Sequence, residues 1–85
     1  MEYIITFKTT NHAIKAEQTL LEHNFQVGVL PLPTQISAGC GISLRIKSDD
    51  IKPALEALTQ RKIDKTGVYT RVTVNTKHIY TEAQI

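Results

Sequence analysis

Two hydrophobic periodicities alternate along the chain. Residues 2–8 alternate, with Tyr3, Ile5 and Phe7 on one face of an extended segment, and three later segments show the same period of two. These segments predict strands at about residues 2–8, 25–30, 42–47 and 68–74. Apolar residues recur at helical spacing between them and predict two helices, over residues 11–23 and over about residues 50–61.

Polar residues mark the start of each predicted helix. Residues 9–11 carry side-chain oxygens that can accept hydrogen bonds from the free N–H groups of a first turn. Pro53 locates the start of the second helix, because proline is tolerated only in the first turn, where no intrahelical donor is needed. The cap is therefore expected at Asp49 or Asp50.

The order of these elements is β-α-β-β-α-β, which is the ferredoxin-like plan of the α+β class. We expect a four-stranded antiparallel sheet in the spatial order 4-1-3-2, with both helices on one face. Residues 1–75 would form a single domain and residues 76–85 a loosely held C-terminal tail. This plan carries many unrelated functions, so the function has to be inferred from particular residues.

Composition narrows the function classes. The chain has 85 residues, enough for one small core, and its 10 basic and 8 acidic residues leave a net charge of +2. That balance does not argue for a nucleic-acid partner. No apolar run approaches the roughly 20 residues that span a bilayer, and the N-terminus lacks a signal-peptide pattern. A single cysteine excludes an internal disulfide, so we expect a cytoplasmic protein without a membrane partner.

The single cysteine, Cys40, lies between two glycines after a long proline-containing segment. In the predicted topology three connections share one edge of the sheet: residues 8–12, 30–41 and 61–67. Cys40 should therefore lie near the N-terminus of the first helix, whose free N–H groups favour a thiolate, as do nearby cations. The residues expected around this thiol are Thr9, Thr10, Asn11, Ser37, Gly39, Gly41, Arg61 and Lys62.

A second interpretation of Cys40 stays open. Free cysteines are commonly buried and inert, so Cys40 could instead be a small apolar residue packed beneath a glycine-rich turn. His12 could serve the thiol as a general base or could be a solvated residue at a helix start. The three histidines show no metal-ligand spacing and no cofactor motif is present, so we expect neither a metal nor a cofactor.

The sequence also resembles a small bacterial family of selenium/sulfur carrier protein-like domains, over about residues 3–70. The resemblance begins with Tyr3-Ile4-Ile5-Thr6-Phe7 and ends with Gly67-Val68-Tyr69. Its most specific part is Leu30-Pro31-Leu32-Pro33 followed by Ile36-Ser37-Ala38-Gly39-Cys40-Gly41. It implies that Cys40 holds sulfur or selenium as a persulfide or selenopersulfide, which donating and accepting proteins deliver and remove.

Two function hypotheses follow. The first is a sulfur or selenium carrier, which needs a reactive thiol and a docking surface but no catalytic triad. The second is a binding or regulatory module in which Cys40 is structural, and which could form a homodimer through an exposed edge strand. Both hypotheses describe a carrier or binding protein rather than a stand-alone enzyme.

Overall fold

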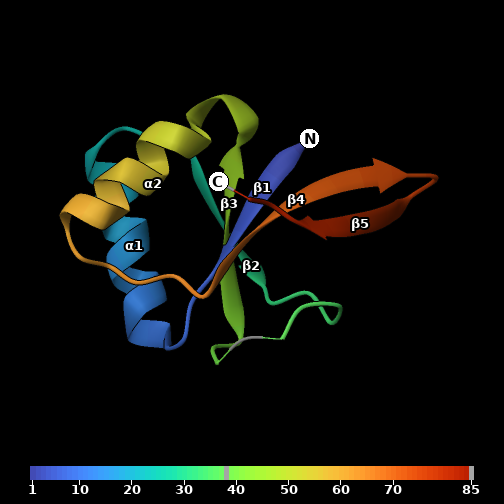
Figure 1. Cartoon of the computed structure of the whole chain (residues 1–85), viewed down its shortest axis with the longest axis horizontal. Helices are drawn as coiled ribbons and strands as arrows, with labels where there is room; N and C mark the ends of the chain where they lie inside the picture. Colours follow the sequence, from blue (N-terminus) through green and yellow to red (C-terminus); the bar gives the residue numbers. More distant parts are fainter. Residues whose placement is uncertain (38, 85) are drawn as a thin grey trace.

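The computed structural model describes residues 1–37 and 39–84. Ala38, which belongs to the loop motif, and Ile85, which ends the predicted tail, lie outside the described residues. In the part described, a five-stranded antiparallel sheet in the order β2-β3-β1-β4-β5 is accompanied by two helices (Figure 1). The strands are β1 (Glu2–Thr6), β2 (Val27–Pro31), β3 (Ile42–Lys47), β4 (Gly67–Val74) and β5 (Lys77–Glu82). The helices are α1 (Thr10–Glu22) and α2 (Ile51–Gln60), the latter preceded by the 3₁₀ turn η1 (Ser48–Asp50).

The predicted four-stranded sheet in the order 4-1-3-2 is wrong, although the fold is α+β. Residues 77–82 form β5, which pairs with β4 along its length, instead of a tail. The chain reverses at Asn75 and Thr76, whose φ angles of 49° and 70° are both left-handed. Two left-handed residues match the twist of an antiparallel hairpin, so this turn brings β5 directly alongside β4.

The core lies between the sheet and the helices. β1 is the central strand and pairs with β3 on one side and β4 on the other. Ile5 of β1 and Phe7, which follows the strand, belong to the buried cluster that both helices cover. The helices contribute the residues that recur at helical spacing: Ala13, Ala16, Leu20, Ile51, Ala54, Ala57 and Leu58. This confirms the amphipathic pattern that predicted the two helices.

Both helices begin at the positions predicted from the sequence. Thr9 is the N-cap of α1, and its hydroxyl accepts a hydrogen bond from the His12 N–H at 3.2 Å. Asp50 occupies the N-cap of α2, but its side chain makes no capping hydrogen bond. Pro53 is the third residue of α2 and so needs no intrahelical acceptor. Neither helix of the described chain is long and apolar enough to cross a membrane.

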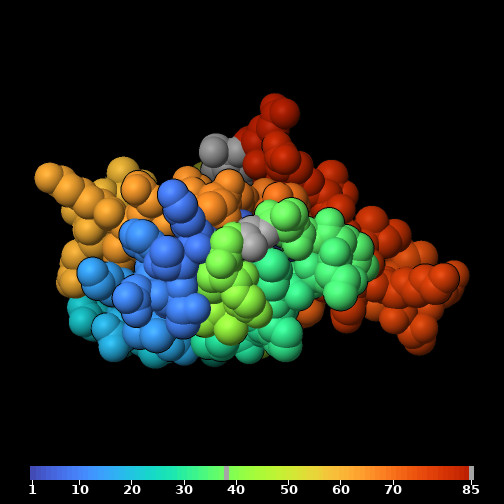
Figure 2. All heavy atoms as spheres, turned by 90° about the horizontal axis from the view of Figure 1, so that it is seen from below, coloured from blue at the N-terminus to red at the C-terminus, as the bar shows by residue number. Residues whose placement is uncertain are grey.

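Three connections meet where β1 ends and β3 and β4 begin, at the bottom of Figure 1; we call this end of the sheet the loop edge. The N–H of Thr66 donates to the carbonyl of Thr6 at 2.8 Å, and their hydroxyl oxygens are 2.7 Å apart. Seen from below, the start of α1, the β2–β3 connection and the α2–β4 connection lie together (Figure 2). The fold therefore brings distant parts of the sequence to one surface.

Candidate functional site

Cys40 lies at the loop edge, two residues before the start of β3, and is almost fully buried, with 4% of its surface exposed. It belongs to the same hydrophobic cluster as Phe7, Ala13 and Leu44. The thiol thus packs into the core from the edge of the sheet. This burial was the alternative interpretation of Cys40, and it means that the sulfur is shielded from solvent in this conformation.

The sulfur has two hydrogen-bond partners, and both belong to Ile42. Sγ donates to the Ile42 carbonyl at 3.2 Å, and the Ile42 N–H approaches Sγ at 3.4 Å. Among the described residues this donor comes from the start of β3 and not from the helix N-terminus expected from the sequence.

Gly39 holds the β2–β3 connection against the end of β1. A Cβ atom placed on Gly39 would lie 2.2 Å from the carbonyl oxygen of Lys8, which is far inside van der Waals contact. Glycine is required here by the close approach of two backbones and not by its φ, because no glycine in the described chain has a positive φ. The two backbones in contact immediately adjoin Cys40 and Thr9, so the thiol and the start of α1 do share the loop edge.

The connection is closed at its base by one ladder bond, because the N–H of Leu32 donates to the carbonyl of Gly41 at 2.9 Å. Within it, Ile36 is buried and donates its N–H to Pro33 at 3.0 Å, whereas Ser37 and Gly39 are exposed. Gly41 is also exposed, and a Cβ there would meet nothing within 4 Å. The neighbours of the thiol in sequence are therefore accessible although the thiol itself is not.

The first turn of α1 forms the other side of the loop edge. Thr9, Thr10 and Asn11 are exposed, and His12 is half-buried. The His12 imidazole Nδ1 lies 2.7 Å from the Thr9 hydroxyl, which also caps the helix. His12 is thereby oriented by the capping residue, and no hydrogen bond links it to Cys40 in the described structure.

One of the predicted cations, Arg61, does not lie at this edge. Arg61 forms an ion pair with Glu22, with 2.9 Å between Nη2 and Oε2. Glu22 ends α1, about 18 Å along the helix axis from Thr10. Lys62 follows Arg61 with a left-handed φ of 57° and is exposed. The structure thus brings together Thr9, Thr10, Asn11, Ser37, Gly39 and Gly41 around the Cys40 segment and separates Arg61 from them.

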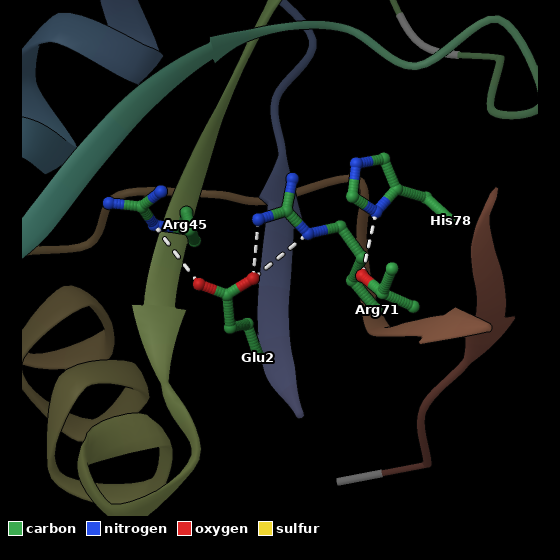
Figure 3. Close-up of polar contacts among 5 residues, drawn as sticks. Glu2, Arg45, Arg71 and His78 are labelled. Atoms are coloured by element: carbon green, nitrogen blue, oxygen red, sulfur yellow. Dashed lines mark hydrogen bonds and ion pairs between the residues drawn. The ribbon is translucent and has the colours of Figure 1, made fainter. Parts of the chain in front are cut away.

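One polar cluster escaped the sequence analysis. On the sheet face away from the helices, Glu2 of β1 accepts hydrogen bonds from Arg71 of β4 and pairs with Arg45 of β3 at 3.4 Å (Figure 3). Partial burial lowers the pKa of Arg71, but hydrogen bonds to Glu2 and Tyr80 outweigh that effect and raise it above the ordinary value. The alternation of charged residues on these strands was a possible signal, although only the pairing register places them together.

Elsewhere the described residues hold no group of three or more histidine, cysteine or acidic side chains placed to bind a metal. The candidate site is therefore a lone thiol on the loop edge of a small α+β domain, next to the contact of Gly39 with Lys8 and hydrogen-bonded to Ile42 at the start of β3.

The comparison with known families agrees with this class of domain. The chain belongs to the family described as "Putative Se/S carrier protein-like", whose model matches residues 2–70 and so includes Cys40 and the loop edge. No curated protein and no solved structure matches the chain significantly. The match ends within β4, so β5 lies beyond the part that defines the family.

Proposed function

We propose that the protein carries sulfur or selenium on Cys40 between a donating and an accepting protein. The Cys40 thiolate would attack the terminal sulfur or selenium of the donor's persulfide or selenopersulfide. The bond between that atom and the donor's own sulfur breaks, the donor leaves as a thiolate, and Cys40 gains the atom without an external oxidant. The observation that carries this proposal is the position of the chain's single cysteine inside the family-matched domain.

Delivery follows the same chemistry in reverse. A thiolate of the acceptor protein attacks the outer atom of the Cys40 persulfide, and Cys40 leaves as a thiolate ready for another cycle. No internal second cysteine is needed, because each step exchanges one bond for another of the same kind. The domain then contributes a nucleophile and a docking surface, which suits a carrier in a reducing compartment such as the cytoplasm.

Burial of Cys40 sets a requirement on this function. The sulfur can react only after the connection 32–41 opens, and the Leu32–Gly41 bond closes the base of that connection. Opening such a segment costs less free energy than unfolding the domain, because the sheet and helices remain packed. We infer that a partner docks on the exposed residues Ser37, Gly39 and Gly41 and favours the open form.

The decisive experiment measures the alkylation rate of Cys40 by iodoacetamide across low urea concentrations. Local opening exposes little surface, so the labelling rate should be nearly independent of urea below the unfolding transition. A structural thiol would instead become reactive only through global unfolding, and its labelling rate would rise with the same urea dependence as the unfolding equilibrium. That outcome would contradict the carrier proposal.

A second measurement tests transfer directly. The native protein is incubated with a low-molecular-weight persulfide, and intact-mass spectrometry follows the gain of one sulfur atom. A thiol-containing acceptor is then added, and the sulfur should leave Cys40 and appear on the acceptor. Cys40→Ala supplies the control for sulfur bound elsewhere. Failure of the folded protein to load, with loading of the urea-unfolded chain, would return Cys40 to a packing role.

The burial of Cys40 also favours one competing function, a binding module in which the cysteine only fills the core. In that case Cys40→Ala should leave partner binding intact, whereas a carrier loses sulfur transfer completely. The two functions therefore differ in what the same substitution removes.

A further inference from the structure

The two outermost strands of the sheet differ in their capacity to accept another strand. β5 forms one edge and β2 the other among the described residues. The N–H of Ala83 donates to the carbonyl of Val68 at 2.8 Å, which fixes the phase of the β4–β5 ladder. Hydrogen-bonded pairs recur at every second residue of an antiparallel ladder, so Lys77, Ile79 and Thr81 face β4. The backbone groups of the alternate residues, His78, Tyr80 and Glu82, therefore point outward.

The other edge strand, β2, is protected against the addition of a further strand. The N–H of Leu32 donates to Gly41, so in the β2–β3 ladder Gly28 and Leu30 face β3 and Val27, Val29 and Pro31 face outward. Proline has no N–H, so Pro31 removes a donor that an added strand would need. β5, in contrast, contains no proline. Exposed apolar side chains lie near both edges of the sheet, at Val29, Val72 and Ile79, so they do not distinguish the two edges. The backbone of β5 alone offers a full set of partners.

We propose that β5 pairs with β5 of a second copy of this chain to form a two-fold symmetric dimer with a continuous sheet. A two-fold axis perpendicular to the sheet keeps each side chain on its own face. The register centred on Tyr80 uses all three outward residues, so Tyr80 lies opposite Tyr80 of the second copy. In this register His78 lies opposite Glu82 of the second copy, and the relation is repeated by symmetry. Every outward N–H and C=O of His78, Tyr80 and Glu82 then finds a partner, about six hydrogen bonds in all.

The side chains fit the same register. The His78 imidazole, whose Nδ1 is 3.0 Å from the Thr73 hydroxyl, would face the carboxylate of Glu82 across the interface. Glu82 is exposed and forms no ion pair within the described chain, so its carboxylate is free to do this. Opposite residues of a hydrogen-bonded pair have Cα atoms about 5.5 Å apart, which is within reach for this contact. A shift of the register by two residues loses both the contact of His78 with Glu82 and some of the backbone bonds.

A charge-exchange experiment tests the partner and the register together. Sedimentation velocity over a concentration series should show a weak dimer that dissociates on dilution. His78→Glu places two carboxylates opposite each other at both symmetric positions and should weaken the dimer Kd about tenfold. Adding Glu82→Lys to His78→Glu restores opposite charges and should recover the original Kd. A monomer at all concentrations, or a double variant no better than the single one, would overturn the proposal.

Crosslinking tests the geometry independently of affinity. In a Cys40→Ser background, Tyr80→Cys places the two thiols on the symmetry axis, where the expected Cα separation suits a disulfide. Val29→Cys in the same background is the matched control, because it lies at an outward position on the other edge. Mild oxidation should link the Tyr80→Cys protein into covalent dimers several-fold faster than the control. Equal rates, or faster linking through Val29→Cys, would show that β5 is not the interface.

Discussion

The connection around Cys40 and the β4–β5 turn join neighbouring antiparallel strands in different ways. The first is long, is held by the backbone contact of Gly39 with Lys8, and buries Ile36 and Cys40. The second has two residues, Asn75 and Thr76, and lies at the tip of a hairpin that projects away from the helices (Figure 1). The strands of this hairpin carry exposed apolar side chains. Packing therefore stabilises the first connection, whereas ladder hydrogen bonds stabilise the second.

The largest loss of stability is expected from a substitution at Gly39, where the connection around Cys40 approaches the backbone of Lys8 most closely. Gly39→Ala places a methyl group against the Lys8 carbonyl and should lower the free energy of unfolding by about 2–3 kcal/mol, because backbone has to move. Gly41→Ala is the matched control, since its Cβ meets open space, and should change stability by no more than about 0.5 kcal/mol. Urea unfolding measures both. Equal effects would contradict the close approach as the stabilising contact.

Gly39→Ala should also alter the thiol. By separating the connection from β1, it should speed the alkylation of Cys40 at low urea, whereas Gly41→Ala should leave the alkylation rate unchanged. A Gly39→Ala protein that is destabilised but alkylated no faster would show that the contact supports the core without controlling access to Cys40.

A smaller loss of stability is expected from substitution of Arg71 in β4, which contacts Glu2 of the central strand β1. Arg71 is mostly buried, with 13% of its side chain exposed, and hydrogen-bonds Glu2, so Arg71→Gln should cost about 1–2 kcal/mol. Arg45→Gln should cost about 0.5 kcal/mol or less, because that ion pair is far more exposed. Urea unfolding compares the two variants. A larger loss for Arg45→Gln would reverse the assignment of the stronger contact.

The direction in which pH changes the stability contributed by the Arg71–Glu2 contact follows from the pKa of Arg71. Since the pKa of Arg71 is raised in the folded state, its stabilising contribution is fully present below the ordinary arginine pKa and is lost only as the pH rises through the raised value. The difference in unfolding free energy between the parent and Arg71→Gln should therefore not decline between neutral pH and pH about 9.

The smallest change should be a gain of stability in the hairpin. Thr76 is β-branched and has a φ of 70°, a conformation that glycine adopts without steric cost. Thr76→Gly should therefore stabilise the hairpin by about 0.5–1 kcal/mol, seen as slower hydrogen exchange of the β5 amides. Asn75→Gly should gain less, because asparagine tolerates a left-handed φ. Faster exchange in the Thr76→Gly protein would contradict this account.

The sequence predicted the helices and the first four strands because each buries a regular apolar stripe, as the clustering of Ile5, Leu20 and Leu58 shows. It missed β5 for a physical reason. Ile79 is the only aliphatic residue of β5 and is 50% exposed, so the strand is held by pairing with β4 and leaves little hydrophobic pattern. Its turn is Asn75-Thr76 in place of the Asn-Gly pair that predicts hairpins.

The candidate site was predicted in part. The topology correctly placed Cys40 and Thr9 at one edge, because both follow from the ends of β1 and β3. No local pattern encodes the close approach of Gly39 to Lys8, which lies beside the buried Cys40. The position of Arg61 likewise depends on where α2 crosses α1, and its ion pair with Glu22 forms only in the folded chain.

The central position of β1 has a consequence for synthesis of the chain. β1 is made first, yet both strands that flank it, β3 and β4, are encoded much later. The hairpin-like pairs β2–β3 and β4–β5 close short loops, whereas each ladder of β1 closes a long one at a greater entropic cost. Nascent β1 therefore emerges from the ribosome with both edges unpaired, and the edge that pairs with β4 stays unpaired until β4 follows. A message truncated before Gly67 would yield a chain in which one edge of β1 has no partner strand. Such an unpaired edge makes the chain a substrate for chaperones and proteases.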